Sequence, residues 1–170
     1  MARSSRRRDR EPEDFVTPHV PLDLAAQADP PRVGAFRRAL KRWLAEALEA
    51  RQAAAGQPLD LPDEVADVAE DLVLATSEAL ENIVDHAFAG VAAPGTMMLR
   101  ADLVEDVVTI VVADDGHWRA PQTGPTMRGR GLTLMQNLAG AMVEHARGGT
   151  TVTMRRLLPE PAHDRPRAQA

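Results

Sequence analysis

Apolar residues recur every three or four positions in two long stretches, which is the spacing of an amphipathic helix. The first stretch predicts a helix over residues 31–50, ended by Gly56-Gln57-Pro58. The second predicts a helix that opens at Asp60-Leu61-Pro62 and runs to about Ala87, with the proline near its first turn. The buried stripes are Val33, Phe36, Leu40, Trp43, Leu44, Ala47 and Leu48 in the first helix and Val65, Val68, Ala69, Leu72, Thr76, Ala79, Leu80 and Ile83 in the second.

Alternating and continuous apolar runs elsewhere predict strands. Residues 96–104 and 107–113 form one expected hairpin around Glu105-Asp106, and residues 142–146 and 150–158 form another around Arg147-Gly148-Gly149. Residues 15–24 alternate only partly and contain two prolines, so they are expected as a strand at a sheet edge. A turn at Pro94-Gly95 precedes the first hairpin, and a Gly- and Pro-rich loop over residues 114–131 leads to a short helix over residues 132–141.

This order of elements predicts an α+β two-layer sandwich, in which helices cover one face of a mixed, mostly antiparallel sheet. Parallel doubly wound folds need a regular alternation of strand and helix, which is missing here. The predicted domain spans residues 15–158. An Arg-rich disordered tail is expected over residues 1–14 and a flexible, Pro-rich tail over residues 159–170.

Composition narrows the function classes further. With 170 residues, 44% hydrophobic, the chain fits one domain with a real core, and no run approaches the length that crosses a bilayer. Only 3% of residues are aromatic and the net charge is −5, which argues against a surface for nucleic acid. Cysteine is absent, which excludes disulfides and thiolate chemistry and fits a soluble, cytoplasmic protein.

Lys41 is the single lysine and lies within the first helical pattern. The P-loop requires Gly-Lys-Ser/Thr, and a Schiff-base enzyme requires a lysine in a pocket. Both classes are therefore excluded, and so is the eukaryotic type of protein kinase with its strand lysine. Nine acids and no bases lie between Asp60 and Asp85, which indicates either a solvated helix face or a docking surface for a basic partner.

Three short segments carry candidate chemistry. Glu78 and Asn82 are four residues apart, so they share one face of the second helix, where Glu can accept a proton and Asn can offer an oxygen to Mg²⁺. Asp114 and Gly116 follow an apolar strand directly, and strand ends are where α/β proteins place ligands. In Gly129-Arg130-Gly131, glycines precede a helix whose free N–H groups can face phosphate.

Each segment alone is a weak signal, but their order and spacing together resemble a known family. They are similar to the N, G1 and G2 boxes of the gyrase and histidine-kinase ATPase superfamily, the Bergerat ATP-binding fold. The branch of bacterial anti-sigma-factor serine/threonine kinases is the most similar, with its Ser-Glu-Ala-x-x-Asn-x-x-x-His-Ala and Gly-Arg-Gly-Leu-x-Leu-Met motifs. The closing run at residues 149–154 also looks like that branch, and the resemblance covers roughly residues 18–157.

The resemblance implies ATP and Mg²⁺ as cofactors and a role for each matching residue. Asn82 is expected to bind Mg²⁺, and Glu78 to be the general base for phosphoryl transfer. Asp114 is expected to hold the adenine amine, with Gly116 shaping the floor of the pocket and Thr150 near the adenine. Gly129, Arg130 and Gly131 are expected to close over the phosphates. The G1 box departs from the family pattern at Trp118, which replaces its last glycine, and this concerns nucleotide affinity more than the fold.

The family implies an enzyme that phosphorylates a serine or threonine of a small anti-anti-sigma protein of the STAS type and sequesters a sigma factor. A homodimer is common in that family. The alternative is a nucleotide-gated binding module without kinase activity, and Glu78 favours the kinase because only the kinase needs it. A two-component histidine kinase needs a phosphoacceptor His on an upstream helix. His19 lies between two prolines, Pro18 and Pro21, so this interpretation is excluded.

Overall fold

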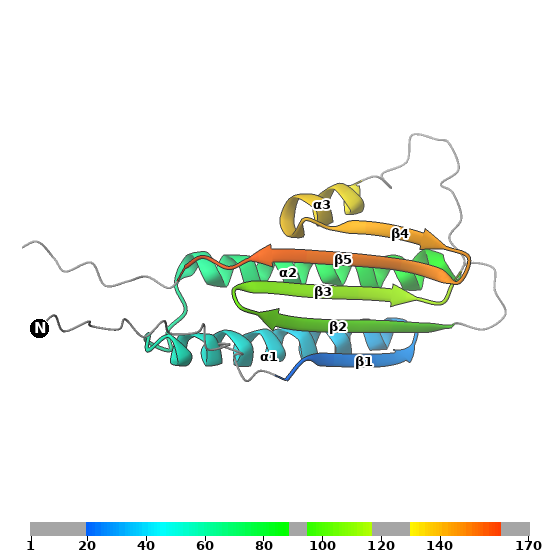
Figure 1. The fold of residues 1–170 in the computed structure, drawn as a ribbon. Helices are drawn as coiled ribbons and strands as arrows, with labels where there is room; N and C mark the ends of the chain where they lie inside the picture. Colours follow the sequence, from blue (N-terminus) through cyan, green and yellow to red (C-terminus); the bar gives the residue numbers. More distant parts are fainter. Residues whose placement is uncertain (1–19, 89–94, 117–129, 161–170) are drawn as a thin grey trace, which may run out of the picture.

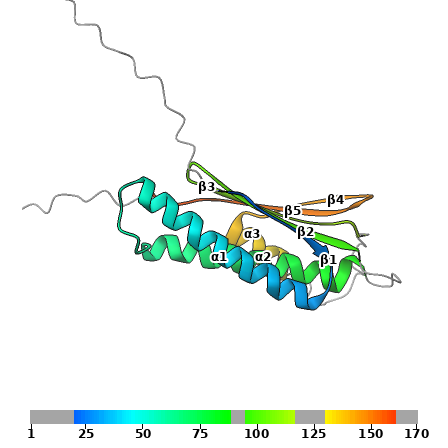
Figure 2. The same cartoon turned by 90° about the horizontal axis from the view of Figure 1, so that it is seen from below.

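A computed structural model describes residues 20–88, 95–116 and 130–160 of the chain. They form one five-stranded sheet with the strand order β1-β2-β3-β5-β4, covered by helices on one face (Figures 1 and 2). All four strand pairings are antiparallel, so the expected parallel component of the sheet is absent from the described residues. The two-layer α+β fold is confirmed.

Helix α1 spans Pro30–Ala54 and is longer at both ends than the spacing predicted. Asp29 caps its first turn, because the Asp29 carboxylate accepts a hydrogen bond of 2.9 Å from the backbone N–H of Arg32. The chain turns away after the helix at Gly56, whose φ of +67° is the left-handed conformation that glycine adopts without strain.

Helix α2 spans Asp63–Asn82, and the chain continues as a π-helical turn, η1, over Ile83–Ala87. The prediction of one continuous α-helix to Ala87 was therefore wrong in its last turn. Apolar spacing cannot reveal a single π turn, because one wider turn shifts the pattern by only one residue. Helix α3 spans Arg130–Ala139, two residues earlier than predicted at both ends.

Strands β2 (Thr96–Val104) and β3 (Val107–Asp114) form the predicted first hairpin, and β4 (Met142–Ala146) and β5 (Gly149–Leu157) form the second. Strand β1 spans Leu22–Gln27 and pairs with β2 at the edge of the sheet. The predicted edge position is thus correct, but the strand lies further along the chain than residues 15–24. Residues 1–19, Pro94 and residues 161–170 lie outside the described part of the chain. They include all of the predicted tail over residues 1–14 and most of the predicted tail over residues 159–170.

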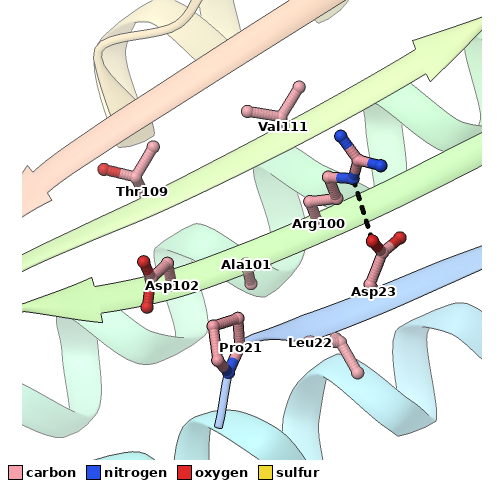
Figure 3. A pocket seen from close by; sticks show the side chains of 8 residues that line it. All are labelled: Pro21, Leu22, Asp23, Arg100, Ala101, Asp102, Thr109 and Val111. Atoms are coloured by element: carbon pink, nitrogen blue, oxygen red, sulfur yellow. Dashed lines mark hydrogen bonds and ion pairs between the residues drawn. The ribbon is translucent and has the colours of Figure 1, made fainter. Parts of the chain in front are cut away.

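The core fills the space between the helices and the inner face of the sheet. The two predicted stripes supply it together with inward residues of the central strands, and its fully buried side chains include Leu40, Leu72, Leu80, Leu99, Ile110 and Met154. The other face of the sheet is not covered by any described element. It carries a shallow hollow between β1, β2 and β3, where Arg100 pairs with Asp23 at 3.1 Å (Figure 3).

Arg51 connects the C-terminal end of α1 to the end of the sheet that holds Asp106 and Pro159. Its buried guanidinium donates from Nε to Oδ1 of Asp106, in the β2–β3 turn, and from Nη2 to the backbone oxygen of Pro159, both at 2.7 Å. The backbone N–H of Leu158 also donates to the Asp106 carbonyl oxygen at 2.7 Å. These contacts fix one end of the molecule, and the candidate site lies at the other end. No helix in the described residues is long and apolar enough to cross a membrane.

Candidate nucleotide-binding site

Asp114 is the buried acidic group at the end of β3. Its residue is 6% exposed, and its Oδ1 accepts a hydrogen bond of 2.7 Å from the backbone N–H of Gly116. Burial raises the pKa of Asp114 above its ordinary value, and the nearby charge of Asp115 raises it further. Backbone hydrogen bonds from Gly116 and Thr150, and the proximity of His145, lower this pKa and offset part of the effect of burial. The Asp114 carboxylate is therefore an acceptor that is largely shielded from solvent.

Asp115 has a different role, although it is the next residue. It is exposed, and its Oδ1 accepts a hydrogen bond of 2.7 Å from the backbone N–H of Thr96, which joins the end of β3 to the start of β2. Asp114 is the buried acid of the two, and its role in binding a ligand stays a prediction. The buried members of β3 are Val108, Ile110 and Val112, and Asp114 continues their alternation.

Two glycines allow the backbone to close around Asp114. A Cβ atom on Gly116 would lie 2.6 Å from the carbonyl oxygen of Ala87 and 2.9 Å from Oδ1 of Asp114, so Gly116 packs directly against the end of η1. Gly149 has a φ of +135°, and a Cβ atom there would overlap the backbone oxygen of Asp114. The start of β5 and the end of η1 can therefore approach Asp114 only because neither glycine has a side chain.

Glu78 and Asn82 are half-buried near the end of α2, as the predicted shared face requires. Glu78 lies against Gly131 in the first turn of α3, since a Cβ atom on Gly131 would overlap Oε1 of Glu78. Asn82 is the last residue of α2, and η1, which follows it, ends at Ala87 against Gly116. One continuous segment thus runs from the Glu78 and Asn82 end of α2 through η1 to Gly116. Figure 1 shows this end of α2 at the same end of the sheet as the end of β3.

Thr150 lies beside Asp114 at the start of β5, and its backbone N–H is one of the donors to the Asp114 carboxylate. Its hydroxyl oxygen lies 3.3 Å from Nδ1 of His145 on β4. His145 was not predicted as a site residue. The signal was available in the second hairpin, because its two-residue turn pairs His145 with Thr150 across the strands.

Not every predicted residue can be placed. Gly129 and Trp118 lie outside the described residues, and Arg130 is described only as the first residue of α3, without its side chain. His86 is exposed within η1 and takes no described part in the site. The described site therefore consists of Glu78 and Asn82 with Gly131 on the helical side, and of Asp114, Gly116 and Thr150 on the sheet side.

The donors and acceptors present fit an adenine nucleotide with a hard cation. A buried carboxylate such as that of Asp114 can accept a hydrogen bond from an exocyclic amine. Mg²⁺ in nucleotide sites is commonly held by one or two side-chain oxygens together with phosphates and water, and Asn82 can supply such an oxygen. The start of α3 is a helix N-terminus, where backbone N–H groups and the helix dipole can favour a phosphate.

Comparisons with known proteins identify the family to which the chain belongs. Residues 26–156 match the family described as Histidine kinase-like ATPase domain. The chain is similar to the Serine-protein kinase RsbW of Bacillus pumilus, at 34% identity over 105 residues, and to that of Bacillus licheniformis, at 33% over 104 residues. Each match covers 52% of this chain and 65% of the relative, so the chain spans about two thirds of the length of these proteins.

A solved structure supports the same relationship. The RsbU and RsbW domains of Rv1364c from Mycobacterium tuberculosis match this chain with a TM-score of 0.61 and 28% sequence identity. The match covers 84% of this chain and 34% of that chain.

Proposed function

Since the chain belongs to the family of histidine kinase-like ATPase domains, we propose that it binds ATP with Mg²⁺ and transfers the terminal phosphoryl group to a serine or threonine of another protein. The observation that carries the proposal is the convergence at one end of the sheet. Buried Asp114, with Gly116 and Thr150 around it, is joined by η1 to the helix end that bears Glu78 and Asn82. The similarity to serine-protein kinases named RsbW supports the choice of acceptor residue.

Each residue has one task in this proposal. Asp114 accepts a hydrogen bond from the adenine amine, and Gly116 shapes the floor of the pocket. Asn82 supplies an oxygen to Mg²⁺, and Gly129 and Arg130 join Gly131 in closing over the phosphates. When bound, Mg²⁺ neutralises the charge that develops on the transferred group.

Glu78 accepts the proton of the attacking hydroxyl. The oxygen of the acceptor serine or threonine forms a bond to the terminal phosphorus, the bond to the leaving ADP oxygen breaks, and the hydroxyl proton passes to the Glu78 carboxylate. Glu78 is half-buried on α2 and lies against the first turn of α3, which supports its proposed position near the phosphates. General-base assistance of this kind contributes roughly 100- to 10,000-fold to a rate.

The partners we propose are an anti-anti-sigma protein of the STAS type as the phosphoryl acceptor and a sigma factor that the protein sequesters. A pull-down from a bacterial lysate with and without ATP, followed by mass spectrometry, identifies both classes. A sigma factor and a small STAS-type protein among the captured partners are expected. If neither is captured under either condition, this choice of partners is wrong.

Glu78→Gln tests the catalytic part. We expect ATP affinity within a few-fold of the wild type and phosphorylation of the captured anti-anti-sigma protein slower by roughly 100-fold or more. Glu81→Gln, exposed on the same helix, is the matched control and should transfer at the wild-type rate. Equal rates for Glu78→Gln and wild type would remove Glu78 from the mechanism. Nucleotide binding without any transfer by the wild type would favour the alternative function, a nucleotide-gated binding module.

We also propose that the protein forms a homodimer through the open face of the sheet, the face opposite the helices. Val104, Val107 and Leu157 are neighbours in one row across β2, β3 and β5, and Val104 and Leu157 are 61% and 70% exposed. In the next row on this face, Asp102 lies on β2 and Arg155 lies on β5, on opposite sides of β3. A two-fold axis along β3 would therefore place Asp102 of each copy opposite Arg155 of the other.

The charge pairing makes the dimer testable. Arg155→Asp should dissociate the dimer, as measured by analytical ultracentrifugation, because it places two acids opposite each other twice. Asp102→Arg combined with Arg155→Asp restores the pairing and should restore the dimer. A monomeric wild type, or dissociation that the double variant does not reverse, would contradict this interface while leaving the nucleotide site unaffected.

A further inference from the structure

The carboxylate of Glu78 occupies the space beside Gly131 in which a side chain would begin. A Cβ atom on Gly131 would overlap Oε1 of Glu78 and would lie 2.9 Å from Cδ and 3.2 Å from Cγ. Glu78 comes from α2 and Gly131 is the second residue of α3, and these two helices pack against each other. The whole carboxyl end of Glu78 is therefore in contact with the first turn of the neighbouring helix.

The backbone of α3 does not itself require glycine at this position. Among the glycines that the structure describes, Gly56, Gly140 and Gly149 have a left-handed φ and Gly131 does not. Inside a helix glycine is less favourable than alanine, because it loses more conformational freedom on folding. The contact with Glu78 supplies the missing reason, since it is the group that a larger residue at position 131 would meet first.

We propose that Gly131 is a positioning residue for Glu78. The missing side chain leaves the space in which the carboxylate lies against α3, and a side chain at position 131 would move the carboxylate away from it. This proposal rests on the proposed function, in which Glu78 accepts the hydroxyl proton. It adds that Gly131 acts on the reaction through Glu78, in addition to allowing phosphate to approach the backbone.

The contact can be tested without any activity, by thermal unfolding of four proteins: the wild type, Gly131→Ala, Glu78→Ala and the double variant. Without the Glu78 carboxyl, alanine at position 131 should raise Tm, because alanine favours the helix. With Glu78 present, Gly131→Ala must displace the Glu78 side chain. The Tm shift caused by Gly131→Ala should therefore be lower by about 2 °C or more than the shift that it causes in the Glu78→Ala background. Equal shifts in both backgrounds would overturn the contact.

The effect on catalysis is tested by shortening the acid. At saturating ATP, Gly131→Ala should lower kcat of phosphoryl transfer by roughly 10- to 100-fold, because small misplacement of a reacting group is costly. Glu78→Asp withdraws the carboxylate by one methylene. It should lower kcat when position 131 is glycine and raise it when position 131 is alanine. Gly148→Ala, where an added Cβ atom meets nothing within 4 Å, is the control and should leave kcat unchanged.

The outcomes separate the two proposals. If Glu78→Asp lowers kcat equally in both backgrounds, or if Gly131→Ala acts only by weakening ATP binding, then Gly131 does not position Glu78, and the proposed kinase function stands. If the wild type transfers no phosphoryl group to any captured partner, the proposed function fails, and with it the catalytic role of the contact. The unfolding measurements then decide only whether the contact exists.

Discussion

At the scale of single residues, two neighbouring acids have opposite roles. Asp114 is buried and faces the site, whereas Asp115 is exposed and closes the hydrogen bonding between β3 and β2. The pKa of Asp114 is raised chiefly by burial, so the folded state binds its proton more tightly than the unfolded chain does. Its contribution to stability is therefore fully present at low pH and is lost as the pH rises through the folded-state pKa.

The direction of this pKa shift predicts how Asp114→Asn changes stability with pH. Near neutral pH the ionised carboxylate lowers the stability of the wild type, and protonation removes this effect. The Tm of Asp114→Asn minus that of the wild type should therefore fall as the pH is lowered from 7 toward 4, as measured by calorimetry. ATP binding should weaken roughly 10- to 100-fold, the usual cost of losing a charged hydrogen-bond acceptor. A difference in Tm that rises on acidification would contradict the buried, ionised state of Asp114.

Gly149 allows the closest approach of two backbones in the site. Gly149→Ala combines a φ of +135° with overlap of the new Cβ atom and the Asp114 carbonyl oxygen. We expect it to lower the free energy of unfolding by at least about 2 kcal/mol. Gly148→Ala, one residue earlier and open to solvent, should stay within about 0.5 kcal/mol of the wild type. Urea denaturation of both variants measures the contrast, and equal effects would contradict the close approach.

At this scale the sequence predicted residue types better than their contacts. Asp114 could be distinguished from Asp115 by continuing the alternation of β3. The contact between Glu78 and Gly131 could not be predicted, because it joins two helices through the absence of a side chain. Motif spacing places residues along the chain, whereas such a contact depends on how the helices pack.

At the scale of elements, the end of the second helix determines how the two halves of the site meet. The sequence predicted a helix to Ala87, and the length was right, but the last turn is the π turn η1. The wider turn ends with the carbonyl oxygen of Ala87 beside Gly116. Hairpins were predicted well because a short turn brings neighbouring strands together locally. A single π turn has no comparable pattern in the sequence.

Arg51 determines how α1 is held at the opposite end of the molecule. Arg51→Ala removes a buried guanidinium that bonds to Asp106 and to the Pro159 carbonyl oxygen. Asp106 is partly exposed, which limits the cost, so we expect a loss of about 2–3 kcal/mol in the free energy of unfolding. Arg100→Ala, which breaks the exposed pair with Asp23, should cost less than about 1 kcal/mol. If urea denaturation shows similar losses of unfolding free energy for the two variants, burial does not determine the contribution of Arg51.

At the scale of the whole molecule, the two-layer architecture followed from the order of the predicted elements. The long-range pairings did not, because β1 pairs with β2 across two intervening helices and β3 pairs with β5 across α3. Local periodicity contains no information on which distant strands become neighbours. The solved structure that matches this chain with a TM-score of 0.61 supports the same fold independently.

The position of β1 has a consequence for the order in which the native structure opens. Its last residue, Gln27, pairs with Thr96, so forming this edge closes a loop of about 70 residues, whereas the two hairpins close over two-residue turns. Strand β1 should therefore dock late during folding and detach first. In hydrogen–deuterium exchange, its amide protons should exchange well before those of β3, which is paired on both sides. Protection of β1 equal to that of β3 would mean that the sheet opens as a single unit.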